Sequence, residues 1–176
     1  VLRLITDVVA DTLNMMKSAR KGQVLQNCVL DFTDAFFRVP LAPGERKYFV
    51  AHYRGVFIVW NRVAQGSNNG PQSWGIVSAL ISRLAQSVFK PSALALHACT
   101  DDPIATMIGT QATVNRNAAI LILLWRVLGF QLAFANGQLG PFVSWVGHEI
   151  SADLANKVIT ITIKKAFLDE SLQLTL

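Results

Sequence analysis

The chain has 176 residues, of which 52% are hydrophobic and only 15% are charged, so it is long enough for one domain with a buried core. Its 16 lysine and arginine residues outnumber its 11 acidic residues, and the net charge of +5 suits a polyanionic partner, although most such side chains are simply solvated. Two cysteines are too few for a disulfide framework, and the longest apolar run, 118–125, falls far short of the roughly 20 residues of a membrane span. Nothing indicates secretion or a membrane, so we expect an intracellular protein, cytoplasmic or nuclear.

The first half of the chain predicts a helix and three strands. Residues 1–22 carry apolar side chains at helical spacing, namely Leu4, Val8, Leu13 and Met16. The run 24–32 (VLQNCVLDF) predicts a buried strand, and 48–63 predicts two strands joined by a turn at Arg54-Gly55. The chain begins with Val1 and has more apolar surface than a domain of this size needs to bury, so we expect a piece of a longer protein.

A helix and a hairpin follow. Pro71 suits the first turn of the helix. The face that we expect to pack on a sheet carries Trp74, Val77, Ile81, Leu84 and Val88. Residues 94–109 contain two short apolar runs separated by Asp101 and Asp102, which predicts two strands joined by a tight turn.

The remaining elements are one helix and several short strands. The apolar periodicity predicts a buried helix over 115–128, capped near Thr113 or Asn115 and ended by Gly129. Short strands are expected at 131–134 (QLAF), 142–147 (FVSWVG) and 157–165 (KVITITIKK). This order predicts an α+β fold of split βαβ, ferredoxin-like type: a small antiparallel sheet with helices packed on one face.

In such a sheet the first strand and the hairpin can be neighbours, which brings Asp31 close to Asp101 and Asp102. Two adjacent aspartates alone are typical of a solvated turn. Three carboxylates together predict a site for a divalent cation, because a cation neutralises acids that would otherwise repel one another.

Several motifs occur in an order and at spacings that are typical of one protein family. They are VLDFTDAFFRVPL (29–41), RKYFVAHY (46–53), NRVAQGSNNGPQSW (61–74), CTDDP (99–103), LGFQLAF (128–134) and SWVG (144–147). Over about residues 25–150 the chain resembles the palm of the retroviral and retrotransposon reverse transcriptases, which are right-hand polymerases. The resemblance implies a helical lead-in from a fingers region over 1–22, the palm over 23–153 and the start of a thumb or connection segment over 154–176. The resemblance also implies that fingers and thumb are largely missing from this sequence.

The resemblance implies a nucleotidyltransferase site. Asp31, Asp101 and Asp102 match the catalytic acids, which would bind two Mg²⁺ ions, with Mn²⁺ as a substitute. Oxygen ligands suit magnesium, which shares its coordination with substrate phosphates.

Further positions match those that contact the incoming nucleotide in the family. Phe36 matches the aromatic gate that leaves no room for a ribose 2′-hydroxyl and so favours deoxynucleotides. Asp34 and Ala35 match the segment whose backbone amides face the triphosphate. Gln65 and Gly66 match the residues that contact nucleotide and template; a glycine lets the backbone come close to a ligand. Outside the family each of these residues would be read as core or loop.

The resemblance also implies residues that contact the primer, namely Cys99, Thr100, Trp145 and Gly147. Trp145 could equally belong to the core. Cys99 stands where the family usually has an aromatic residue, often tyrosine. Asn136 aligns with a lysine that can protonate the departing pyrophosphate, a step that an amide cannot perform at neutral pH. His52, His97 and His148 lack metal-ligand spacing and are read as structural or surface residues.

Two classes of function follow from these observations. The first is a fragment of an RNA-directed DNA polymerase of a retroelement, which extends a DNA primer. Its partners would be an RNA or DNA template with primer, deoxynucleoside triphosphates and the other polyprotein domains, namely fingers, thumb, ribonuclease H and integrase; a virus-like particle is a further setting. The alternative is a catalytically inactive remnant or a nucleic-acid-binding module with a palm fold. An RNA-copying RNA polymerase is disfavoured by Phe36.

Overall fold

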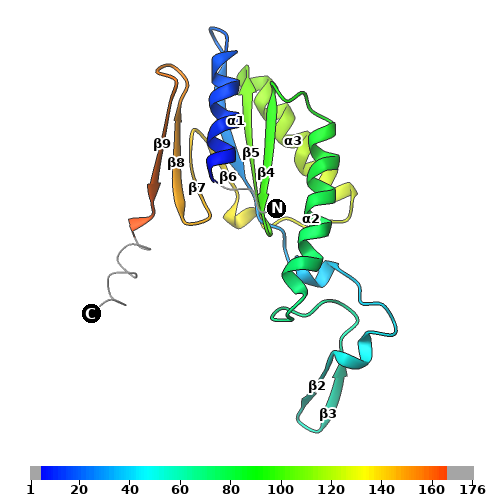
Figure 1. The fold of residues 1–176 in the computed structure, drawn as a ribbon. Coiled ribbons are helices and arrows are strands. Elements are labelled where there is room, and N and C mark those ends of the chain that lie inside the picture. The colour runs from blue at the N-terminus through cyan, green and yellow to red at the C-terminus, as the bar shows by residue number, and fades with distance from the viewer. Residues whose placement is uncertain (1–4, 166–176) are drawn as a thin grey trace, which may run out of the picture.

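The computed structural model describes residues 5–165. Its main sheet has four antiparallel strands in the order β4-β5-β1-β6, so β1 lies in the interior of the sheet (Figure 1). The strands are β1 (Val24–Val29), β4 (Leu94–Cys99), β5 (Asp102–Gly109) and β6 (Gln138–Gly140). The predicted hairpin is therefore confirmed, and so is its place beside the first strand.

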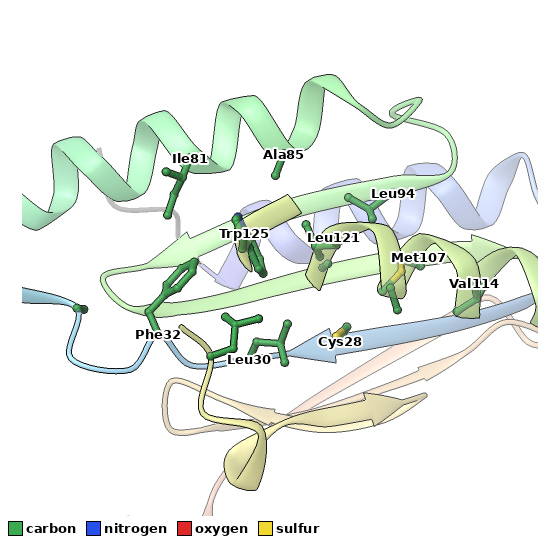
Figure 2. Packing of buried hydrophobic residues seen from close by; sticks show 14 of the residues in the cluster. Cys28, Leu30, Phe32, Ile81, Ala85, Leu94, Met107, Val114, Leu121 and Trp125 are labelled. Atoms are coloured by element: carbon green, nitrogen blue, oxygen red, sulfur yellow. The ribbon is translucent and has the colours of Figure 1, made fainter. Parts of the chain in front are cut away.

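Two helices, α2 (Gly70–Ser87) and α3 (Gln111–Val127), pack on one face of this sheet. Figure 2 shows Cys28, Leu94 and Met107 of the sheet meeting side chains of both helices. Phe32, just beyond β1, contacts the rings of Trp74 and Trp125 edge-on. The predicted α+β fold with a small antiparallel sheet is confirmed, and α2 and α3 share one face of that sheet.

The second face of the sheet is also covered. It packs against α1 (Ile5–Lys17) and a three-stranded antiparallel sheet, β7 (Phe142–Trp145), β8 (His148–Asp153) and β9 (Val158–Ile163). Val29 and Ile104 of the main sheet contact this layer. The predicted domain boundaries after residues 22 and 153 stay predictions, although β9 pairs with β8. Leu4 of the predicted helix and residues 166–176 of the predicted thumb segment lie outside the described residues.

The buried face of α2 differs from the predicted one. Its buried residues are Gly70, Trp74, Ser78, Ile81 and Ala85. Leu84 and Val88 are exposed, by 44% and 54%. A helix turns by about 100° per residue, so a stripe centred on Trp74 and Ile81 leaves Leu84 at its side. Val88 lies beyond the helix, at its C-cap.

Two boundaries also differ from the predictions. Helix α3 begins earlier than expected, because the Thr110 side chain accepts a hydrogen bond from the Thr113 amide at 3.2 Å and caps it. Gly129, with a φ of +86°, follows the end of α3 as predicted. The segment 131–134 is not a strand: Leu132 forms an isolated bridge with Phe32, and Phe134 begins a 3₁₀ helix, η3 (Phe134–Asn136).

A hairpin, which we call the β2–β3 arm (residues 50–59), projects away from this body (Figure 1). It consists of β2 (Val50–Tyr53) and β3 (Val56–Val59), joined as predicted at Arg54-Gly55, and its side chains are mostly exposed. Short 3₁₀ helices, η1 (Phe36–Arg38) and η2 (Arg46–Tyr48), lead into it. In the described part of the chain, no helix combines the length and apolar character that crossing a membrane requires.

Candidate active site

The three acids meet where β1 and the β4–β5 hairpin end. Beyond the pair Val29↔Ile104, the Leu30 amide donates to the Pro103 carbonyl and the Phe32 amide to the Asp101 carbonyl, both at 3.1 Å. The antiparallel pairing therefore continues through Asp31. The fold thus brings Asp31 to the turn that carries Asp101 and Asp102.

The carboxylates at this turn interact electrostatically. Burial raises the pKa of the Asp102 carboxyl above its ordinary value, and the negative charges of Asp101 and Asp31 raise this pKa further. Each of the three acids is partly accessible to solvent. The arrangement is therefore a cluster of like charges with a half-buried member.

A hollow of about 150 Å³ opens beside this cluster. It is lined by Asp31 and Asp102 and by Asn136, Gln138 and Ser144, among others. Within residues 5–165 no group of three His, Cys, Asp or Glu side chains is already arranged around a metal position. The donor set nevertheless fits Mg²⁺, which takes carboxylate oxygens and water, and a cation would relieve the repulsion at Asp102.

The backbone of the turn is held by side chains of α2 and β7, of which only Trp145 was predicted to belong to the site. The Thr100 carbonyl accepts hydrogen bonds from Trp74 Nε1 at 2.9 Å and from Ser78 Oγ at 3.0 Å. The Asp102 carbonyl accepts one from Trp145 Nε1 at 2.9 Å. Trp74 belongs to a motif that we quoted, but its helical spacing indicated only a core residue. Nothing in the sequence distinguishes Ser78 from a surface serine.

The predicted nucleotide-contacting residues lie along two segments that the fold joins. The two segments are connected by an isolated β-bridge between Pro40 and Arg62. They are also connected by a 2.9 Å hydrogen bond from the Val63 amide to the Val39 carbonyl. On the first segment Asp34 is exposed with a φ of +54°, and Ala35 is buried. On the second segment Gln65 and Gly66 are exposed, and Gly66 has a φ of +87°, which glycine adopts without strain.

Phe36 lies in η1, half-buried against α2. A methyl group on Gly70, at the start of α2, would lie 3.2 Å from the Phe36 ring and 2.8 Å from Ser67 Oγ. The absence of a side chain at Gly70 therefore leaves room for the Phe36 ring and for Ser67. The roles of Asp34, Ala35, Phe36, Gln65 and Gly66 toward a nucleotide stay predictions.

The predicted primer-contacting residues lie on two turns. Cys99 is half-buried and pairs with Asp102 across the β4–β5 hairpin. Val146 and Gly147 form the turn between β7 and β8, each with a positive φ. Trp145 is only 3% exposed, so its side chain is part of the core, as the sequence analysis allowed. Contact of these residues with a primer stays a prediction.

Among residues 5–165, no histidine lines the hollow beside the acid turn. His97 is buried in β4 and lies 3.2 Å from the Asp11 carboxylate of α1. A pocket of about 490 Å³ adjoins that pair between α1 and the edge of β4. His52 is tilted against Phe57 in the β2–β3 arm, and His148 Nδ1 lies 2.8 Å from the Val146 carbonyl.

Comparison with known proteins places this geometry in a structural context. No family model matches the sequence, and no curated protein matches it. A solved structure does match: a foamy viral protease-reverse transcriptase in complex with an RNA/DNA hybrid, with a TM-score of 0.62 and 14% identity over 90% of this chain. The chain spans 19% of the length of that protein. At this level of identity the likeness shows the fold alone, and the chain has a fold similar to part of a reverse transcriptase.

Proposed function

We propose that this chain is the palm of an RNA-directed DNA polymerase that extends a primer by nucleotidyl transfer. The observation that carries the proposal is the meeting of Asp31 with Asp101 and Asp102 at one end of the main sheet, where burial and then the two neighbouring charges raise the pKa of Asp102. Two magnesium ions, when bound, lower the pKa of the primer 3′-hydroxyl and neutralise charge on the leaving pyrophosphate.

The residues of the chain would have separate tasks around this centre. Asp31 and Asp101 would hold the ions, and Asp102 would complete the negative cluster. Phe36 would lie under the sugar of a deoxynucleoside triphosphate, while the backbone of Asp34 and Ala35 would face the phosphates. The β7–β8 turn at Gly147 would support the primer end, and template, primer and further polyprotein domains would complete the enzyme.

A second function is favoured by one observation. Asn136, which lines the hollow beside Asp31 and Asp102, offers an amide where the family usually has a lysine. An amide does not act as a general acid at neutral pH. A chain that kept the acids and lost the proton donor would be a slow polymerase or an inactive palm that only binds nucleic acid.

Metal binding by the 176-residue chain is the direct test. Because opposing carboxylates bind a shared cation, we expect Mn²⁺ to bind in calorimetric or spin-resonance titrations and Mg²⁺ to compete for the same site. Asp31→Asn and Asp101→Asn should each weaken binding at least tenfold. Glu45→Gln, an exposed change next to η2, is the control and should leave affinity unchanged. Equal affinity in all four proteins would refute the proposal.

Turnover separates the two functions. In the polymerising full-length protein, Asn136→Lys should raise the single-turnover rate of incorporation by about 10²-fold, the low end of general-acid effects. The isolated chain should extend a primer little or not at all, because phosphoryl transfer depends on holding primer, template and nucleotide in line. Metal and nucleic-acid binding without incorporation, in the full-length protein and its Asn136→Lys variant alike, would favour the inactive palm.

A further inference from the structure

The backbone of the turn between β4 and β5 is bonded along its whole length. The three successive carbonyls of Thr100, Asp101 and Asp102 all accept hydrogen bonds from outside the hairpin. Trp74 and Ser78 donate from α2, Phe32 donates from the segment after β1, and Trp145 donates from β7. Four donors on three separate parts of the fold thus converge on three successive residues, the two of the loop and the first of β5.

The two indoles reach the turn from opposite sides of the sheet. Trp74 is fully buried in the core formed with α2 and α3. Trp145 is buried in the core on the other face, with Val29, Ile104 and Val143. A buried indole is rigid, and its N–H group loses its only polar partner if the accepting carbonyl moves away. Each tryptophan therefore opposes a displacement of the turn toward the other face.

The turn needs such support because its conformation is unfavourable for its sequence. Thr100 has a φ of +56°, in the left-handed region that β-branched residues rarely adopt. Two-residue hairpin turns with a positive φ at the first loop position usually place glycine there. The like charges of the three aspartates add a second force that drives the turn away from Asp31.

We propose that Trp74 and Trp145, assisted by Ser78, are positioning residues that clamp the backbone of the acid turn so that Asp101 and Asp102 stay beside Asp31 before a cation binds. The purpose of the clamp rests on the proposed function, whereas its geometry rests on the hydrogen bonds described above. The indoles act through the carbonyls of Thr100 and Asp102, to which their N–H groups donate. Preorganisation of this kind raises affinity because the free site does not have to be assembled when the ligand arrives.

A matched control lies in the same core. Trp125 is as buried as Trp74 and belongs to the same cluster, but its indole nitrogen has no hydrogen-bond partner among the residues that the structure describes. Tryptophan to phenylalanine removes similar ring volume at each site. Trp74→Phe and Trp145→Phe also remove a donor to the turn, whereas Trp125→Phe does not.

The first measurement reports on the turn without any metal. The Phe32 amide donates to the Asp101 carbonyl, so its hydrogen exchange follows the opening of the turn. The Ile108 amide, bonded to Ala93 at the far end of the hairpin, serves as the reference. Trp74→Phe and Trp145→Phe should speed exchange at Phe32 several-fold more than at Ile108. In Trp125→Phe the two amides should change by the same factor.

The second measurement is Mn²⁺ affinity. We expect Trp145→Phe, and the double variant Trp74→Phe with Ser78→Ala, to bind Mn²⁺ about tenfold more weakly, which corresponds to the loss of one or two ordinary hydrogen bonds. Trp125→Phe should bind like the unaltered chain even where its melting temperature falls. Equal losses of affinity in Trp145→Phe and Trp125→Phe, once corrected for stability, would overturn the clamp. If the unaltered chain bound no Mn²⁺, the proposed function would fail, while the exchange of Phe32 would still decide whether the indoles hold the turn.

Discussion

Asp102 is half-buried beside two other carboxylates, and this single residue links the site to the stability of the fold. Its pKa is raised in the folded chain, so the folded state binds more protons than the unfolded state between the raised and the ordinary value. Without a divalent cation, its contribution to the free energy of unfolding therefore increases as the pH falls through the raised pKa. It levels off below the ordinary aspartate value.

The first prediction follows from the direction of this pH dependence of stability. Asp102→Asn should raise the melting temperature of the cation-free chain near neutral pH by a few degrees, because it removes a mutually repelling charge. It should also flatten the dependence of stability on pH. Thermal melts over a pH series are the measurement. Asp153→Asn is the control and should lower the melting temperature instead, since hydrogen bonds from Asn156 lower the pKa of Asp153 in the folded chain.

Phe36 carries the second prediction. In the polymerising protein, Phe36→Ala should lower the preference for deoxynucleotides over ribonucleotides by tenfold or more, since a removed aromatic side chain leaves space for a 2′-hydroxyl. Gly70→Ala should also change the preference, because its methyl group would displace the Phe36 ring or Ser67. The ratio of kcat/KM values for the two sugars is the measurement. Unchanged ratios in both variants would show that Phe36 does not select the sugar.

The two cysteines should differ in reactivity, which is the third prediction. Burial raises the pKa of the Cys28 thiol to about 11, so at pH 8 only about a thousandth of it is thiolate. Cys99 is half-buried at the end of β4, two positions before Asp101. An alkylating reagent should modify Cys99 in the folded chain and Cys28 only after unfolding, as peptide mass spectrometry can show. Modification of Cys28 at the rate of Cys99 would contradict the packing described for β1.

Among the elements, α2 does more than cover the sheet. β4 is an edge strand, and Gln86 of α2 bonds with this edge as a neighbouring strand would, donating to the Leu94 carbonyl at 2.9 Å and accepting from the Leu96 amide at 2.8 Å. Further along, Trp74 and Ser78 bond with Thr100. One helix therefore covers part of an edge that would otherwise be open to another chain.

The β2–β3 arm carries the fourth prediction. A two-stranded hairpin that packs on little else is marginally stable in water. Arg54 lies at its tip, with a φ of +49°, and the flanking side chains are exposed. Limited digestion with trypsin should therefore cut first after Arg54 and leave the body of the protein folded. Earlier cleavage within α2, for example at Arg83, would show that the arm is better ordered than the helix.

At the scale of the whole molecule, the sequence predicted what depends on local pattern. Strand runs around Asp101 predicted the hairpin, and helical periodicity predicted α2 and α3 to within a few residues. It did not predict that α1 and the β7-β8-β9 sheet cover the second face, because an apolar stripe does not identify its partner. The roles of Ser78 and Gln86 were not predicted either. The sequence does not show whether a polar side chain bonds with a buried backbone group or with water.

The position of β1 has a consequence for how the molecule folds. β1 is hydrogen-bonded to β5 and β6, whose paired residues lie 75 to 113 positions further along the chain by the observed register. During synthesis β1 therefore has no strand to pair with until the β4–β5 hairpin has been made, and contacts of such long range slow folding. The acid centre cannot exist in any folding intermediate that lacks the β1–β5 pairing. We expect the ability to bind Mn²⁺ to appear only in the last kinetic phase of refolding, after the helices have formed.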